Sequence, residues 1–182
     1  MSTKMVEALS DFKTRFYQTF GMTETASHIA LKEVGKEIYT PIGDVELGVD
    51  DRSCLSIKGT VTDQKWIQSN DVVEMTEDGF KWLGRADFVI NSAGVKLHPE
   101  KIENLISDQF PEATFALSSE RDNTLGERAV LVSTSPILAR INTLRFLNKY
   151  EVPKKELIME ELPVLASGKL DRIKLKELVA HY

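Results

Sequence analysis

The chain has 182 residues, of which 42% are apolar and 28% charged, so it is long enough for one or two domains with hydrophobic cores. This composition excludes disordered, collagen-like and disulfide-rich classes of protein, and the length excludes enzymes that need several hundred residues. Its 23 basic and 28 acidic residues give a formal net charge of −5, which provides no basic surface for nucleic acid or an anionic membrane.

The N-terminal segment and the cysteine content indicate a cellular compartment. Cys54 is the only cysteine, so no intramolecular disulfide can form and a reducing compartment is expected. Residues 1–7 lack the apolar stretch of a signal peptide, and no apolar run approaches the ~18–20 residues of a membrane span. The sequence therefore predicts a cytoplasmic protein. The three histidines are scattered along the chain, and no zinc site is predicted.

The first half of the chain predicts one helix and a β unit. Residues 4–16 carry Met5, Leu9 and Phe12 at helical spacing. Short β-rich runs separated by glycines follow, at 45–47, 54–57, 72–75 and 80–83. Residues 76–79 predict a hairpin turn between the last two runs. Whether the chain itself supplies packing partners for the apolar side chains of residues 1–37 is left open.

The second half predicts a mixture of helices and strands. Residues 88–90 and 95–97 are expected to pair, and Pro99 is expected to start a helix. Further strands are predicted at 114–117, 129–132 and 157–159, and helices at 136–150 and 171–181. We therefore predict an α+β fold class. A helix followed by a small, mostly antiparallel β unit makes up residues 1–85, and a compact α+β domain spans 86–182.

The first stretch with chemical potential runs from Phe20 to Thr25. Gly21 permits a close backbone approach, the Thr23 hydroxyl can donate to a phosphate oxygen, and the Glu24 carboxylate can hold Mg²⁺. An ordinary turn capped by threonine and glutamate is the alternative, and the six residues by themselves favour it.

The second stretch contains Asp71 and Arg85. A carboxylate at position 71, just ahead of a predicted strand, can accept hydrogen bonds from both hydroxyls of a ribose. Arg85 lies at the predicted domain junction and can donate to phosphate or ribose oxygens. An aspartate turn and a surface arginine are the alternative, and taken alone these residues favour it.

The third stretch, 163–172, carries Lys169 beside Gly168. It is no P-loop, because Pro163 stands in place of the first glycine and Leu170 follows the lysine. A mobile ammonium group on a loop ahead of a helix can neutralise charge in a phosphoryl or acyl transition state. A solvated lysine in a helix-entry loop is an equally good interpretation of this stretch alone.

Together these stretches resemble the adenylate-forming superfamily of acyl-CoA and aryl-CoA synthetases. The aromatic-Gly-x-Thr-Glu motif at 20–24, the ribose aspartate at 71, the hinge block at 84–87 and 92–103, and the Pro-x-x-x-x-Gly-Lys-x-x-Arg motif at 163–172 occur in the order typical of that family. Within it, residues 23–29 are most similar to the o-succinylbenzoate–CoA ligases of menaquinone biosynthesis.

The resemblance implies an acid–thiol ligase of the AMP-forming type that uses ATP, Mg²⁺ and coenzyme A. Lys169 is the implied catalytic residue of the adenylation step, and Glu24 the implied Mg²⁺ ligand. The implied nucleotide-binding residues are Phe20, Gly21, Thr23, Asp71 and Arg85.

The resemblance also implies a domain movement between two half-reactions. Asp87 matches the hinge, and Gly94 lies on the loop that approaches the coenzyme A channel. Ala26, Ser27 and His28 are implied neighbours of the acyl pocket, although a surface role for His28 is equally expected. Residues 1–85 then correspond to the C-terminal remnant of a large adenylation domain, and 86–182 to the lid domain.

Three departures from the family pattern qualify this assignment. Asn70 precedes Asp71 where the family usually has glycine, and the β unit between Gly43 and Trp66 is short. The family's upstream Ser/Thr/Gly-rich phosphate loop has no counterpart. We therefore expect the C-terminal part of a ligase that acts on a small-molecule carboxylate, o-succinylbenzoate being the first candidate. The isolated chain is then inactive or weakly active.

The sequence leaves two other functions open. The chain is either a non-catalytic fragment or assembly module that complements a separate N-terminal domain, or part of a different acyl- or aryl-CoA synthetase. The N-terminal domain of a parent ligase is the expected protein partner, and oligomers are possible. Nucleic acid and membrane are not expected as partners.

Overall fold

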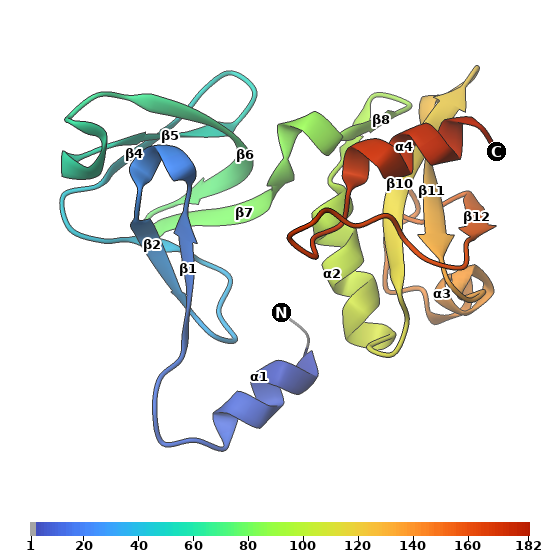
Figure 1. Cartoon of the computed structure of the whole chain (residues 1–182), viewed down its shortest axis with the longest axis horizontal. Coiled ribbons are helices and arrows are strands. Elements are labelled where there is room, and N and C mark those ends of the chain that lie inside the picture. The colour runs from blue at the N-terminus through green and yellow to red at the C-terminus, as the bar shows by residue number, and fades with distance from the viewer. Residues whose placement is uncertain (1–2) are drawn as a thin grey trace. The chain divides into compact units, whose positions relative to one another are not determined.

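A computed structural model describes residues 3–182, with side chains from residue 6 onward. The chain divides into two compact units, Thr3–Asp87 and Phe88–Tyr182, coloured blue to green and green to red in Figure 1. The division falls two residues after the boundary at residue 85 that the sequence indicated.

The first unit contains helix α1 (Thr3–Ser10) and two antiparallel sheets. Helix α1 ends before the predicted residue 16. The hydroxyl of Ser10 donates to the carbonyl of Glu7 at 2.6 Å, which is a local bond of the kind that competes with helix continuation. The strands of the smaller sheet are β1 (Tyr17–Gly21), β2 (His28–Glu33) and β3 (Thr40–Pro41). Those of the larger sheet are β4 (Glu46–Val49), β5 (Cys54–Lys58), β6 (Ile67–Thr76) and β7 (Gly79–Arg85).

One hydrophobic core serves both sheets of this unit. Ile29 and Ala30 of β2 are fully buried with Leu55, Ile57 and Phe80 of the larger sheet. The chain thus supplies partners for part of the apolar set in residues 1–37, although Phe12 stays 61% exposed. The β1–β2 pairing was missed because neither segment shows a clear alternation of apolar and polar residues.

The second unit is built on a five-stranded sheet in which β10, β11, β8 and β9 follow one another and β12 pairs with β11 in parallel. The predicted hairpin between β8 and β9 is confirmed, with Ile90 opposite Leu97. The strands are β8 (Ile90–Ser92), β9 (Val95–Leu97), β10 (Phe115–Asp122), β11 (Gly126–Ser133) and β12 (Lys155–Ile158).

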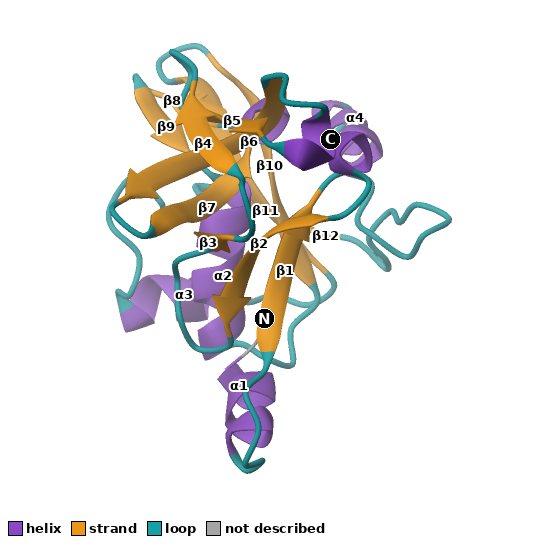
Figure 2. Ribbon diagram, turned by 90° about the vertical axis from the view of Figure 1, so that its left-hand side faces the viewer, coloured by secondary structure: helices purple, strands orange, loops and turns teal. Residues whose placement is uncertain are grey.

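Helices cover both faces of this sheet. Helices α2 (Pro99–Gln109) and α3 (Leu138–Leu144) pack on the face that carries Leu117 and Leu131, and α4 (Arg172–Ala180) packs on the face that carries Val130 and Val132. Figure 2 shows α2 and α3 on one side of β10 and β11 and α4 on the other. Successive side chains of β11 therefore point to opposite faces of the sheet and pack into two separate cores.

The α+β prediction is confirmed by these antiparallel sheets and few helices. The helix predicted over 136–150 is wrong beyond residue 144. It ends there because Arg145 adopts a left-handed backbone conformation, with φ of +53°.

Candidate functional site

The segment after β1 is a tight loop with little room for side chains on its inner side. The backbone passes Gly21 so closely that a Cβ there would lie 2.4 Å from the carbonyl oxygen of Ser27. A short 3-10 turn, η1 (Thr23–Thr25), follows, and Ala26 then adopts a left-handed conformation with φ of +51°. Only glycine fits at position 21 without displacing the backbone.

Thr25 holds this loop together. Its side chain is buried, and its hydroxyl accepts the N–H of Met22 at 3.1 Å. The hydroxyl oxygen also lies 2.9 Å from the carbonyl of Met22 and 2.8 Å from that of Ser27, either of which can accept its proton. The sequence analysis singled out no role for Thr25 in binding, and no sequence signal marks its hydroxyl as buried.

The loop presents the implied phosphate, metal and acyl-pocket residues on its outer side. All of them are exposed: Thr23, Glu24, Ala26, Ser27 and His28. In the described part of the chain, the Glu24 carboxylate has no hydrogen bond or ion pair. Residues 3–182 contain no cluster of three or more His, Cys, Asp or Glu side chains suited to a metal. A single free carboxylate still fits Mg²⁺, which usually takes one or two carboxylates together with phosphate oxygens.

Phe20 precedes this loop and is partly buried in an aromatic group. Its ring packs edge-on against Phe80 at 5.2 Å and against Tyr39 at 5.7 Å between centroids. The rings of Tyr39 and Phe80 are stacked at 5.4 Å. These contacts fix the plane of the Phe20 ring, and its remaining exposed part is open to stacking.

Asp71 is held at the end of the β6–β7 hairpin. Its side chain is 14% exposed, and one carboxylate oxygen accepts the indole N–H of Trp82 at 2.8 Å. Arg85 is its cross-strand partner, with the guanidinium 4.0 Å from the second oxygen. The sequence analysis did not identify Trp82 as the hydrogen-bond donor to Asp71. The hairpin register offers a signal, because Val73 pairs with Trp82 and Asp71 is therefore its diagonal neighbour.

Asp87 has two partners within the first unit. Its carboxylate pairs with Arg85 at 2.9 Å and accepts the side-chain amide of Asn70 at 3.4 Å. Asn70 thus has a contact that the glycine usual in the family could not make.

Two implied residues lie in the second unit. Gly94 is exposed at the turn between β8 and β9, with φ of +79°. The neighbouring N–H of Ala93 donates to the carbonyl of Leu125 at 2.7 Å, so the turn is fastened to the β10–β11 hairpin. Gly94 and Lys169 are the two candidate site residues of the second unit, and the remaining candidate site residues belong to the first unit.

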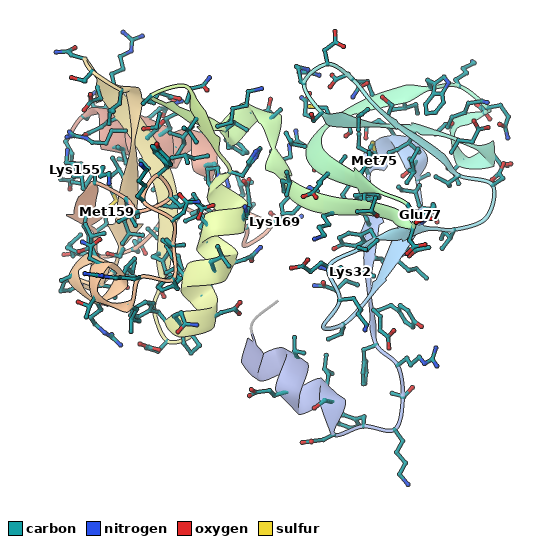
Figure 3. All side chains as sticks on the ribbon, turned by 180° about the vertical axis from the view of Figure 1, so that it is seen from behind. Lys32, Met75, Glu77, Lys155, Met159 and Lys169 are labelled. Atoms are coloured by element: carbon teal, nitrogen blue, oxygen red, sulfur yellow. The ribbon has the colours of Figure 1, made fainter. Side chains whose placement is uncertain are left out.

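Lys169 lies on the loop ahead of α4, where Figure 3 labels it. Its side chain is exposed, and no hydrogen bond or ion pair within residues 3–182 involves its ammonium group. The loop backbone is closed by Leu165 N–H to the Lys169 carbonyl at 2.8 Å and by Asp171 N–H to the Pro163 carbonyl at 2.8 Å. A free cation therefore stands at the tip of an ordered loop.

The base of this loop carries a charged cluster that the sequence did not single out. The Arg172 guanidinium donates to the Glu103 carboxylate of α2. Glu103 and Arg172 each belong to one of the sequence motifs, at 92–103 and 163–172. Only the packing of α4 beside α2 brings the two side chains together.

None of the helices that the structure describes is long and apolar enough to cross a membrane. No protein-family model matches the chain.

The chain is similar in sequence to curated 2-succinylbenzoate–CoA ligases. The chain is 29% identical to the 2-succinylbenzoate–CoA ligase of Listeria monocytogenes over 88% of its own length and 40% of that protein. It is 28% identical to a 2-succinylbenzoate–CoA ligase of Bacillus cereus over 96% of its length and 44% of that protein. The chain therefore spans less than half the length of these relatives.

The chain is also similar to solved structures. The o-succinylbenzoate coenzyme A synthetase of Bacillus subtilis, in complex with ATP and magnesium, matches 97% of the chain with a TM-score of 0.80 at 22% identity, and 44% of its own chain is covered. An acyl-CoA synthetase (AMP-forming)/AMP-acid ligase II-like protein of Dyadobacter fermentans is 33% identical, with a TM-score of 0.50 over 97% of this chain and 54% of that one. This chain resembles the C-terminal portion of the adenylate-forming acyl-CoA synthetases, and among them it is similar to the 2-succinylbenzoate–CoA ligases.

Proposed function

We propose that this chain is the C-terminal part of an ATP-dependent acid–CoA ligase and that o-succinylbenzoate is its carboxylate. The observation that carries the proposal is the similarity to 2-succinylbenzoate–CoA ligases over 88% to 96% of the chain, across both units. The residues implied to contact phosphate and Mg²⁺, Thr23 and Glu24, and the implied catalytic Lys169 are exposed on loops closed by hydrogen bonds, which supports the same function.

The reaction has two half-steps. A carboxylate oxygen attacks the α-phosphorus of ATP, and the bond to pyrophosphate breaks to give the acyl-adenylate. The thiol sulfur of coenzyme A then attacks the acyl carbon, and AMP leaves. Mg²⁺ neutralises phosphate charge in the first half-step.

The first unit supplies the nucleotide contacts in this proposal. Asp71 accepts hydrogen bonds from the ribose hydroxyls, with Trp82 fixing its orientation and Arg85 beside it. Phe20 stacks on the adenine, and Gly21 brings the backbone close to the nucleotide. The Thr23 hydroxyl donates to the α-phosphate, and Glu24 is the carboxylate ligand of Mg²⁺.

The second unit supplies the residue that stabilises the transition state. Negative charge accumulates on the carboxylate and phosphate oxygens during adenylation, and the free ammonium of Lys169 is suited to bridge them. Removal of one preorganised donor of this kind typically costs about 10²–10³ in rate. Asp87 is the hinge about which the second unit turns, so that the Gly94 loop replaces Lys169 for thioester formation. Ala26, Ser27 and His28 border the acyl group.

Lys169→Ala tests this assignment in the completed ligase, by which we mean this chain joined to the N-terminal region of a related ligase. We expect adenylate formation to fall by about 10²–10³, because the donor to the developing charge is lost. Thioester formation from supplied acyl-adenylate should stay near the unsubstituted rate. Rapid-quench assays of each half-step provide the measurement.

Lys154→Ala is a matched control, since Lys154 is an exposed lysine of the same unit outside the loop. Equal losses in both half-steps for Lys169→Ala contradict the assignment.

A second candidate function is an assembly module without turnover of its own. The observation that favours it is that each of the two units has its own hydrophobic core within the chain. On this alternative the chain completes a separate N-terminal polypeptide. A ligase for another acyl or aryl acid is the third possibility, and competition between o-succinylbenzoate and long-chain fatty acids for the completed ligase distinguishes it.

A further inference from the structure

The loop that carries Lys169 has an exposed tip and an anchored base. Residues 164–169 are exposed, whereas Leu170 packs against the core beneath α4. Asp171 caps α4 by accepting the N–H of Lys174 at 3.0 Å. Arg172, the first residue of α4, lies three positions after the lysine, so its contacts determine where the loop leaves the domain.

Arg172 is embedded in a carboxylate pair on α2. Its two terminal nitrogens donate to the two oxygens of Glu103 at 3.1 and 2.5 Å, and its Nε lies 3.4 Å from an oxygen of Glu100. The three side chains are only 14%, 16% and 12% exposed, respectively. Such a fork-to-fork pair defines both the position and the plane of the guanidinium.

The cluster also contacts two further parts of the unit. Glu103 also accepts the backbone N–H of Leu117 in β10 at 2.7 Å, and Arg172 approaches the carbonyl of that residue at 3.5 Å. The guanidinium lies 5.6 Å from the ring centre of Phe88, the first residue of the second unit. The base of the Lys169 loop is thereby fixed to α2, to the sheet and to the segment that enters the unit.

The electrostatics favour a permanent charge here. Burial disfavours the charged form of Arg172, but the hydrogen bond and charge of Glu103, with the charge of Glu100, raise its pKa above its ordinary value. Lysine keeps the positive charge but has no planar fork, so it cannot reproduce the bidentate geometry.

We propose that Arg172, clamped by Glu103 and Glu100, is a positioning residue that sets the reach of Lys169 in the adenylation half-step. This inference rests on the proposed function of Lys169. Arg172 touches no reacting atom in this account and acts only through the loop. A displacement of a reacting group by about 1 Å can cost 10²-fold in rate, so a small shift at the loop base is enough to matter.

The first experiment uses the 182-residue chain and the substitution Arg172→Lys. We expect faster hydrogen exchange at the amides of Leu165, Gly168 and Asp171, which close the loop, and little change in β10 and β11. Arg128→Lys is the control, because Arg128 of β11 also pairs with a glutamate, donating through two nitrogens to one oxygen of Glu120, and neither residue belongs to the Lys169 loop or the Arg172 cluster. A uniform rise in exchange throughout the unit for Arg172→Lys indicates a merely structural role and overturns the proposal.

The second experiment measures both half-steps in the completed ligase. Arg172→Lys should slow adenylation by up to about 10²-fold. Thioester formation from supplied acyl-adenylate should be spared, and Arg128→Lys should change neither half-step. The double variant Arg172→Lys with Lys169→Ala should adenylate no more slowly than Lys169→Ala alone, because residues that act as one unit are not additive.

Glu103→Gln provides an independent variant if Arg172→Lys fails to fold. It keeps an acceptor for Leu117 and Arg172 but removes the charge, and it should slow the same half-step. The inference about Arg172 is overturned, and the proposed function is left standing, if Arg172→Lys and Glu103→Gln both adenylate at the unsubstituted rate. It is also overturned if the double variant Arg172→Lys with Lys169→Ala adenylates more slowly than Lys169→Ala by the full factor lost in Arg172→Lys. Unimpaired adenylation by Lys169→Ala overturns the proposed function and the inference with it.

Discussion

At the scale of single residues, the candidate functional groups of the first unit depend on buried or half-buried neighbours with defined hydrogen bonds. Trp82 holds Asp71 through one oxygen, and the other oxygen remains beside Arg85. Thr25 closes the loop that exposes Thr23 and Glu24. An exposed group whose support is buried keeps its orientation without a ligand, which lowers the ordering cost of binding.

Thr25→Val tests this support. The substitution keeps the shape but removes the hydroxyl, so the partly buried N–H of Met22 loses its acceptor. We expect the free energy of unfolding of the first unit to fall by about 1–3 kcal/mol. Thr23→Val, at the exposed position two residues earlier, should stay within about 0.5 kcal/mol of the unsubstituted chain.

Urea unfolding monitored by tryptophan fluorescence is suited to this comparison, because both tryptophans, Trp66 and Trp82, lie in the first unit. Equal stability of the two threonine variants contradicts the assigned role of Thr25.

At the scale of elements, the start of α2 combines a helix entry with a buried imidazole. His98 precedes Pro99, the first residue of the helix, and its Nδ1 is buried without a hydrogen-bond partner in the described structure. Burial lowers the pKa of His98 from 6.5, and the charges of Lys101 and Lys96 lower it further. The folded state therefore favours the neutral ring.

A pH dependence follows from this shift. Because the unfolded chain binds the His98 proton more tightly, stability is fully present above pH 6.5 and declines as the pH falls from there to the lower folded pKa. Carboxylates change stability in a separate, more acidic pH range. Glu120 is an example, because a hydrogen bond from Lys155 lowers its pKa from 4.5. His98→Asn should remove the decline below pH 6.5.

Urea unfolding at several pH values, monitored by NMR signals from β10 and β11, measures this dependence in the second unit. His181→Asn, at an exposed position near the C-terminus, is the control and should keep the decline. A decline of equal size in His98→Asn contradicts this account.

At the scale of the whole molecule, the chain consists of two units that meet at Asp87 and Phe88. Each has its own core, and the implied nucleotide residues and Lys169 are divided between them. This division matches the proposed cycle, in which Lys169 takes part in one half-step and the Gly94 loop in the other.

The sequence predicted the parts of this organisation that depend on local signals. The turn at 76–79, the pairing of the segment that follows residue 88 with 95–97, and the start of α2 at Pro99 follow from glycine and proline placement, and the structure confirms them. The pairing of β1 with β2 and the cluster of Arg172 with Glu103 escaped prediction, because both join segments whose contact only the tertiary fold determines. Thr25 escaped for another reason, since nothing in its sequence context indicates that its hydroxyl is buried.

The most direct measurement of the central claim is pyrophosphate release from ATP in the presence of Mg²⁺ and o-succinylbenzoate. The chain alone should release little or no pyrophosphate. The completed ligase should release pyrophosphate rapidly, and faster with o-succinylbenzoate than with long-chain fatty acids. Strong release by the chain alone, or a completed ligase that prefers a fatty acid, would contradict the account.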